Sequence, residues 1–268
     1  MRLYFFLSIL CVGFVSDIHA AITVDGDLSQ TIIIEPGNTQ EGIIMLRNLS
    51  NASAEVRVYQ TDYSFSSNGQ TDYSNPGENP RSNAGWLFIQ PTRLTISPLS
   101  RSPVYYTVKV PDNQELSGTF WSVVMIEEIP PGSKESNRQQ TDKRVGLSAI
   151  MRYGVQIITE IGDTGTTSLK FLDKKLVIND VGNKSFQIDI ENNGEKWYMP
   201  DLWIELYDSN GNNVGRIEAP KKRIFPGCSV RHLMDISSLK AGKYKMIVIA
   251  DTGNENVFGA EYDLELEE

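Results

Sequence analysis

The stretch that decides the fold is L-S-G-T-F-W-S-V-V-M-I-E-E-I-P-P, which runs from Leu116 to Pro131. A polar segment, residues 132–144, separates it from a second apolar stretch, V-G-L-S-A-I-M-R-Y-G-V-Q-I-I-T-E-I, which runs from Val145 to Ile161. Side chains alternate between apolar and other types at the start of the second stretch, and this period of two is typical of a strand. The pair therefore predicts two long strands joined by a mobile loop.

The second of these strands has one apolar face. Apolar side chains recur at every second position, and the four residues of this row are Val145, Leu147, Ala149 and Met151. A long strand at the end of a domain can offer its backbone and its apolar row to another protein. We therefore predict that these four residues bind a partner, and that the same edge supports self-association when no partner is present.

The rest of the chain consists of short apolar stretches with turn residues between them. Stretches such as Glu55–Thr61 and Leu169–Ile178 predict strands, and no stretch has a helical repeat of useful length. The small, polar segment Gly162–Thr167 is typical of a linker. About seven strands on each side of it predict an all-β protein with two tandem immunoglobulin-like β-sandwich domains, residues 21–161 and 162–268.

Residues 1–20 have the pattern of a cleaved secretory signal peptide. Arg2 precedes an apolar run from Leu3 to Val15, and Ala20 marks the expected cleavage site. The alternative is a membrane anchor, but the apolar run is short for a membrane span. We expect a soluble, exported protein, periplasmic or secreted, that does not span a membrane. Cleavage would leave Cys228 as its one cysteine, so no intramolecular disulfide is expected.

Composition and residue types exclude several functions. The formal net charge of −9 argues against a nucleic-acid partner, because phosphate binding needs a basic surface. His232, expected at a surface or edge position, and Cys228 cannot together form a zinc site of the usual type. Glu127 and Glu128 are adjacent on a strand and point to opposite faces, so we expect a solvated strand end there. We predict a binding protein with no catalytic residue, metal site or cofactor.

Two further segments have distinctive compositions. Ser64–Gly85 is rich in Ser, Asn, Gly and Pro, which predicts a long, mobile surface loop. Trp197 and Tyr198 follow a turn at Asn193–Gly194. Tryptophans of a sandwich belong more often to its core, but this pair could instead form an exposed surface that stacks on a sugar.

The sequence resembles the periplasmic pilus (fimbrial) chaperones, the PapD-like proteins of the chaperone–usher pathway. The resemblance lies in Ile34–Gly37, in Leu94–Pro98 and above all in Gly118–Trp121 through Glu128–Pro131. In that family a strand ending in an E-I-P-P-like segment is followed by a variable loop and by the long last strand of the first domain. The similarity covers residues 28–160.

The resemblance implies a non-catalytic chaperone in pilus biogenesis, with an exported, pilin-like subunit as its client. Family members lend their last first-domain strand to an incomplete pilin fold. Alternating apolar side chains fill the pilin groove while the backbone completes its sheet. By position, those side chains are the row Val145, Leu147, Ala149 and Met151.

The chain departs from the family in the cleft between the domains. The family holds the client's terminal carboxylate there with two basic residues. This chain has Ser29–Thr31 at the first of these positions and Gly154 at the second. Arg152 shares the strand face of Gly154 and is the candidate substitute anchor, while Arg93 and Arg101 are two further candidates.

A second function remains open from the sequence. The chain could be a secreted or surface immunoglobulin-like scaffold that binds an envelope protein or a glycan through loops. The segment Ser64–Gly85 favours this alternative, because pilus chaperones need no such insertion.

Overall fold

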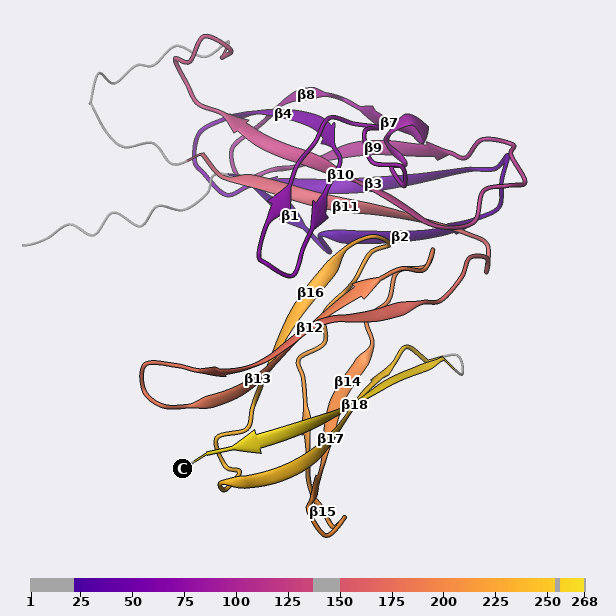
Figure 1. The fold of residues 1–268 in the computed structure, drawn as a ribbon. Coiled ribbons are helices and arrows are strands. Elements are labelled where there is room, and N and C mark those ends of the chain that lie inside the picture. Colours follow the sequence, from indigo (N-terminus) through magenta and orange to yellow (C-terminus); the bar gives the residue numbers. More distant parts are fainter. Residues whose placement is uncertain (1–21, 137–149, 254–255, 268) are drawn as a thin grey trace, which may run out of the picture.

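The computed structural model describes residues 22–136, 150–253 and 256–267, and the predicted signal peptide lies outside them. In these residues the regular elements are strands, apart from one short 3-10 helix, η1 (Ala84–Trp86). The strands build two β-sandwiches that follow each other along the chain and lie one above the other in Figure 1. The predicted all-β fold with two tandem immunoglobulin-like sandwiches is confirmed.

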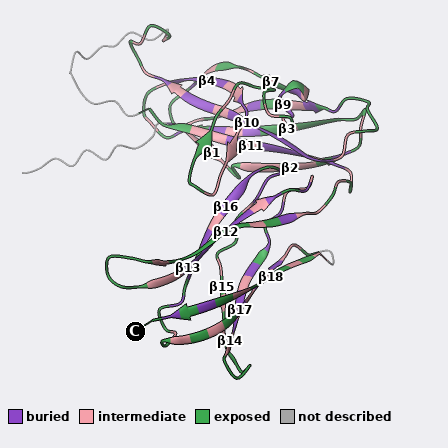
Figure 2. Cartoon of the chain, viewed as in Figure 1, coloured by how far each residue is buried: buried purple, intermediate pink, exposed green. Residues whose placement is uncertain are grey.

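The first sandwich packs a four-stranded sheet on a five-stranded sheet. The four-stranded sheet has the order β1 (Ile22–Asp25), β3 (Thr39–Asn48), β9 (Arg101–Lys109) and β7 (Leu87–Gln90). The five-stranded sheet has the order β2 (Ser29–Ile34), β11 (Arg152–Ile161), β10 (Gly118–Ile129), β4 (Ala54–Thr61) and β8 (Arg93–Ile96). Neighbouring strands are antiparallel except β2 and β11, which are parallel. Buried aliphatic side chains such as Ile44, Val124 and Ile157 form the core of this sandwich. Figure 2 marks the buried stretches of its strands in purple.

The second sandwich packs a three-stranded sheet on a four-stranded sheet. The three-stranded sheet has the order β12 (Leu169–Ile178), β13 (Lys184–Asn192) and β16 (Ser229–Asp235). The four-stranded sheet has the order β15 (Asn213–Glu218), β14 (Asp201–Asp208), β17 (Gly242–Asp251) and β18 (Val257–Leu266). Its core contains Ile188, Ile204 and Val248, and it also takes in Trp121 and Ile158 of the first sandwich. The two sandwiches therefore share a packed junction.

The two decisive stretches pair as an antiparallel ladder. The register runs from Gly118 opposite Ile161 to Glu127 opposite Arg152. The second stretch enters its strand at Arg152, and Met151 precedes the strand. Val145, Leu147 and Ala149 lie outside the described residues, so their place on a strand stays a prediction.

Residues 62–86 connect β4 with β7, and we call them the strap. They contain the hairpin β5 (Ser64–Phe65) and β6 (Thr71–Asp72), followed by η1. The buried carboxylate of Asp62 accepts hydrogen bonds from the Asn79 backbone N–H at 2.8 Å and from the Ser82 hydroxyl at 2.5 Å. These bonds tie the far end of the strap to its start. The predicted surface loop is thus a folded segment.

The strap continues the five-stranded sheet beyond the end of β4. The Trp121 backbone N–H donates to the carbonyl of Arg81 at 2.9 Å. The buried Asn83 amide donates to the Ile157 carbonyl and to the Thr159 hydroxyl, both at 2.9 Å. The strap is therefore fixed on β10 and on β11, the two strands that reach the junction.

Candidate functional site

Among the described residues, the start of β11 is paired on one side only. β10 pairs with β11 along its whole length, but β2 pairs only with Gln156–Ile161. On that side, no strand among the described residues accompanies residues 152–155. The Gln156 N–H donates to the Leu28 carbonyl at 2.9 Å. Because backbone groups alternate along a strand, those of Gly154 face the same side and lie open.

The apolar row reaches this edge at its last member. The side chain of Met151 is 47% exposed, and its neighbour Ile150 is similarly exposed. Continuing the alternation from Tyr153, which packs against the first core, places Met151 on the core-facing side of the sheet. The predicted client-binding role of the whole row remains a prediction.

Arg152 is already paired within the protein. Its guanidinium Nε lies 3.0 Å from Glu127 Oε2, and Glu127 also accepts hydrogen bonds from Arg57 at 2.9 Å and from Tyr59 at 3.0 Å. Burial by itself would raise the pKa of Glu127, but the bonds from Arg57 and Tyr59 and the nearby positive charges hold it below its ordinary value. The expected solvated position of Glu127 is wrong, because its carboxylate is buried in this cluster.

The two other arginines considered from the sequence are also paired. Arg93 lies 2.8 Å from the buried carboxylate of Glu55, and Arg101 lies 2.7 Å from the carboxylate of Asp25. Neither arginine contributes to the cleft between the sandwiches.

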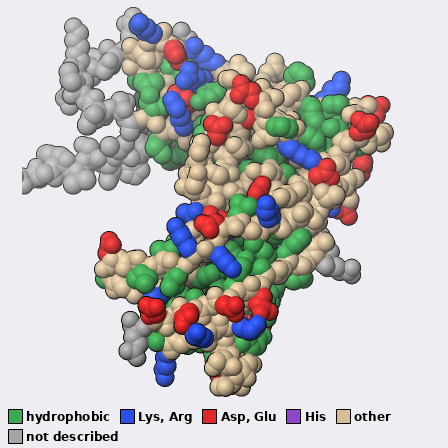
Figure 3. Space-filling view, viewed as in Figure 1, with side chains coloured by type: hydrophobic (Ala, Val, Ile, Leu, Met, Phe, Trp, Pro, Cys, Tyr) green, Lys and Arg blue, Asp and Glu red, His purple; other side chains and the backbone are tan. Residues whose placement is uncertain are grey.

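The cleft at the open edge contains a different arginine. It has a volume of about 590 Å³ and is lined by Asp27, Leu28, Ser29, Gly154, Gln156 and Arg223. In the space-filling view the surface turns inward between the two sandwiches (Figure 3). A Cβ on Gly154 would come within 2.9 Å of the Val123 side chain, so a larger residue fits there only if Val123 moves. Position 154 therefore has no room for a basic side chain without repacking.

Arg223 enters the cleft from the second sandwich. Its Nη1 donates to the Ser29 hydroxyl and to Gln156 Oε1, the latter at 3.2 Å. Its Cζ lies 4.6 Å from the ring centroid of Trp197, a cation–π contact. Its Nε is buried and has no hydrogen-bond partner.

Arg223 places a positive charge in a cleft whose described lining includes one acidic side chain, that of Asp27. No acidic side chain in the described part of the chain forms an ion pair with it. Burial lowers the pKa of Arg223, yet a guanidinium in a protein keeps its proton. A half-buried, unneutralised arginine beside an open cleft is suited to bind an anion, and its planar fork matches a carboxylate. Sequence reasoning missed this residue.

Trp197 and Tyr198 do not form an exposed pair. Tyr198 is only 8% exposed, and its hydroxyl is hydrogen-bonded to Thr167. The Trp197 indole N–H donates to Glu160 at 2.8 Å while Arg223 covers the ring. The predicted sugar-stacking surface is therefore wrong, because both side chains are used in the junction.

The remaining ionisable candidates are buried in the second sandwich. His232 is 1% exposed, contrary to the expected surface position, and neither ring nitrogen has a hydrogen-bond partner. Burial lowers its pKa to about 4, with a smaller effect from Lys222. Burial likewise raises the pKa of the Cys228 thiol, so this thiol is a poor nucleophile.

Two kinds of feature are absent from the described residues. No group of three or more potential metal ligands comes together in them. None of their helices has the length and apolar character needed to cross a bilayer.

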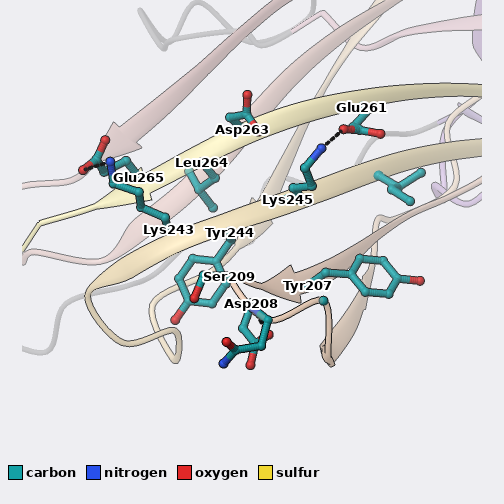
Figure 4. A pocket seen from close by; sticks show the side chains of 13 residues that line it. Tyr207, Asp208, Ser209, Lys243, Tyr244, Lys245, Glu261, Asp263, Leu264 and Glu265 are labelled. Carbon is teal, nitrogen blue, oxygen red and sulfur yellow. Dashed lines mark hydrogen bonds and ion pairs between the residues drawn. The ribbon is translucent and has the colours of Figure 1, made fainter.

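A second hollow of about 930 Å³ lies at the end of the second sandwich away from the junction (Figure 4). The charges along it are mostly matched, because Lys245 pairs with Glu261 at 2.5 Å and Lys243 pairs with Glu265 at 3.4 Å. Unlike the cleft, this hollow has no buried, unpaired charge that points to a ligand.

Comparison with known proteins gives a likeness of structure only. No family model matches the chain, and no curated protein sequence does. A chain of the chaperone–tip adhesin complex of CFA/I fimbriae biogenesis is 15% identical, with a TM-score of 0.50 over 91% of this chain and 98% of that one.

Two further solved structures are similar over most of their length. The class 5 fimbriae chaperone CfaA is 15% identical, with a TM-score of 0.49 over 92% of this chain and 100% of that one. A chain of the CsuC–CsuE chaperone–tip adhesion subunit complex from Csu pili of Acinetobacter baumannii is 13% identical, with a TM-score of 0.47 over 90% and 98%. The chain thus has the PapD-like fold of fimbrial chaperones.

Proposed function

We propose that the protein is a non-catalytic, periplasmic chaperone-like protein that binds exported, pilin-type subunits by strand addition. The start of β11, together with the apolar row Val145, Leu147, Ala149 and Met151, completes the sheet of the client. The observation that carries the proposal is that the open edge of β11 ends at a cleft containing the unneutralised Arg223.

The geometry of the edge gives the bound strand a direction. β2 runs parallel to β11 and begins at Ser29, so a partner strand along residues 152–155 would end where β2 begins. If that strand runs parallel to β11, its C-terminus meets the cleft, and if it runs antiparallel, its N-terminus does. Arg223 attracts a carboxylate and repels an ammonium group. Its charge therefore favours a parallel strand whose last residue lies in the cleft.

Arg223 takes the place of the anchor that the sequence assigned to Arg152. In the resemblance to pilus chaperones, the two basic positions of the cleft fall near Ser29 and at Gly154. Both residues line the cleft here, and Arg223 from the second sandwich reaches Ser29. The proposed anchor thus occupies the same cleft but is supplied by the other domain.

The alternative function, a scaffold that binds an envelope protein or a glycan through its loops, receives no separate support. The segment that favoured it belongs to the strap, which is engaged in contacts with both sandwiches. We therefore propose only the chaperone-like function.

A pair of peptides tests the proposal. Both are fluorescent peptides of alternating threonine and valine, one ending in a carboxylate and the other in an amide. A charge-assisted hydrogen bond contributes about 1.5–3 kcal/mol. The protein without residues 1–20 should therefore bind the carboxylate peptide about tenfold more tightly in fluorescence anisotropy.

The variants Arg223→Met and Arg152→Gln separate the two candidate anchors. Arg223→Met should bind both peptides equally, whereas Arg152→Gln should keep the full preference for the carboxylate. Equal binding of the two peptides by the unmodified protein would contradict the proposed anchor. So would a preference that survives in Arg223→Met or disappears in Arg152→Gln.

A further inference from the structure

Phe225, two residues after Arg223, is held by aromatic side chains from two parts of the first sandwich. Its buried ring stacks on Trp121 of β10, with ring centroids 4.6 Å apart and an interplanar angle of 11°. Phe65 of the strap packs edge-on, with ring centroids 6.3 Å apart and an angle of 64°. The segment that carries Arg223 therefore packs, through Phe225, against β10 and against the strap.

The strap is also fixed to the second sandwich by polar contacts. The Ser67 backbone N–H donates to the Ser229 hydroxyl at 2.9 Å. Arg81 forms an ion pair with Glu195 at 2.8 Å. Ser229 starts β16, directly after the segment that contains Phe225. These contacts fix the strap to the second sandwich on either side of the Arg223 segment in the sequence, at Glu195 and at Ser229.

The second sandwich fixes the segment between these points. The backbone N–H of Ile224 donates to the Tyr198 carbonyl at 2.7 Å, and the Tyr198 N–H donates back at 3.1 Å. Among the described residues no ion pair holds the guanidinium of Arg223. Its position depends on its hydrogen bonds to Ser29 and Gln156, on where this backbone lies and on the Trp197 ring. A small displacement of Phe225 would move the guanidinium relative to Ser29 and Gln156.

We infer that the strap positions the guanidinium of Arg223, and that it does so through the contact of Phe65 with Phe225 and the Ser67–Ser229 hydrogen bond. This inference rests on the proposed function. The strap adds no group to the cleft, whose lining residues come from other segments. Its effect is to hold the guanidinium in place before the client arrives, which lowers the cost of ordering it on binding. The strap thus affects the affinity of the cleft for a carboxylate without lining the cleft itself.

The test measures the ratio of the affinities for the two peptides in Phe65→Ala and Ser229→Ala. A structural weakening would lower the affinity for both peptides equally and leave the ratio unchanged. Loss of positioning lowers the ratio, from about tenfold toward about threefold, while the amide peptide binds as before. Phe88→Ala is the matched control, because Phe88 is an exposed phenylalanine on β7. Phe65→Leu, which keeps an apolar side chain against Phe225, should restore most of the ratio.

The outcomes distinguish the inference from the function on which it rests. If Arg223→Met abolishes the ratio while Phe65→Ala and Ser229→Ala retain it, the anchor stands and the strap has no positioning role. If the unmodified protein shows no preference, or binds neither peptide, the proposed function fails and the inference fails with it. Ser229→Ala removes one hydroxyl and serves as the test if Phe65→Ala does not fold.

Discussion

Arg81 and Arg223 cross the junction between the sandwiches in opposite directions and reach different surroundings. Arg81 extends from the strap to the Glu195 carboxylate at 2.8 Å and to the Ser117 carbonyl at 2.6 Å. Arg223 extends from the second sandwich to the neutral side chains of Ser29 and Gln156, and it has no acidic partner among the residues described. The fold pairs Arg81 with a carboxylate, whereas the described partners of Arg223 are neutral.

The difference separates a structural contact from a candidate binding group. A hydrogen bond from the Thr166 backbone, together with those from Arg81 and Ser117, holds the pKa of Glu195 below its ordinary value. The Glu195 carboxylate that pairs with Arg81 therefore keeps its charge at lower pH than an ordinary glutamate. A half-buried charge is less favourable without an ionic partner than with one, even where neutral groups bind it. Arg223 lacks one, which is the reason to assign it a partner from outside the chain.

The largest expected effect comes from removing the ring on which both sides of the junction pack. Trp121→Ala deletes a fully buried indole that stacks on Phe225 and donates to the Tyr63 carbonyl at 2.7 Å. We expect the free energy of unfolding, measured by guanidinium titration, to fall by about 3–5 kcal/mol. A loss below about 1 kcal/mol would show that the two sandwiches are stable without their shared core.

His232 differs from Arg223 in one respect. It is also buried and has no hydrogen-bond partner for its ring nitrogens, but it can lose its proton and become neutral. Its pKa in the folded protein is about 4, lowered mainly by burial and further by Lys222, with Asp189 opposing. Its ordinary pKa is about 6.5, so the unfolded chain takes up a proton in mild acid and the folded protein does not. Stability is therefore full above pH 6.5 and is lost as the pH falls toward 4, by up to about 3 kcal/mol.

The variant His232→Leu isolates this contribution. Its free energy of unfolding should fall less between pH 7 and pH 4.5 than that of the unmodified protein, by about 2 kcal/mol or more. Carboxylates contribute equally to both proteins and cancel in the difference. Identical pH profiles would mean that His232 is not held neutral by the fold.

The smallest effects compare the two arginines directly. Arg81→Met removes the cation that pairs with Glu195 and should cost about 1–2 kcal/mol of unfolding free energy. Arg223→Met breaks no ion pair of the described residues and loses only contacts with the neutral side chains of Ser29, Gln156 and Trp197, so it should cost less than Arg81→Met. Equal losses in thermal or chemical unfolding would show that Arg223 has a structural role like that of Arg81.

The sequence predicted the strands and the fold class well, for a local reason. Alternation and turn residues are local signals, and the predicted strand Leu169–Ile178 coincides with β12. The two decisive stretches were predicted as long strands, and the structure adds that they pair with each other as an antiparallel ladder. Alternation correctly separated Glu127 from Glu128, but the burial of Glu127 depends on Arg57 and Tyr59 from another strand.

The candidate site was only half predictable, because it joins distant parts of the chain. The resemblance to pilus chaperones placed Ser29 and Gly154 in the cleft, and both line it. The role of the apolar row before β11 stays a prediction. Arg223 lies 194 residues from Ser29, in a segment whose local pattern indicates only a turn. The one local signal was its position directly before the buried pair Ile224 and Phe225. The strap was missed for the same reason, since its composition does not reveal that Phe65 packs on Phe225.

The most direct test of strand addition is capture of a partner from the envelope fraction of the native organism. The protein without residues 1–20 is compared with Leu147→Lys, which places a charge in the apolar row, and with Leu172→Lys, which changes an exposed leucine on β12. We predict that the unmodified protein and Leu172→Lys capture one small, β-rich subunit and that Leu147→Lys does not. Equal capture of that subunit by Leu147→Lys would contradict the account.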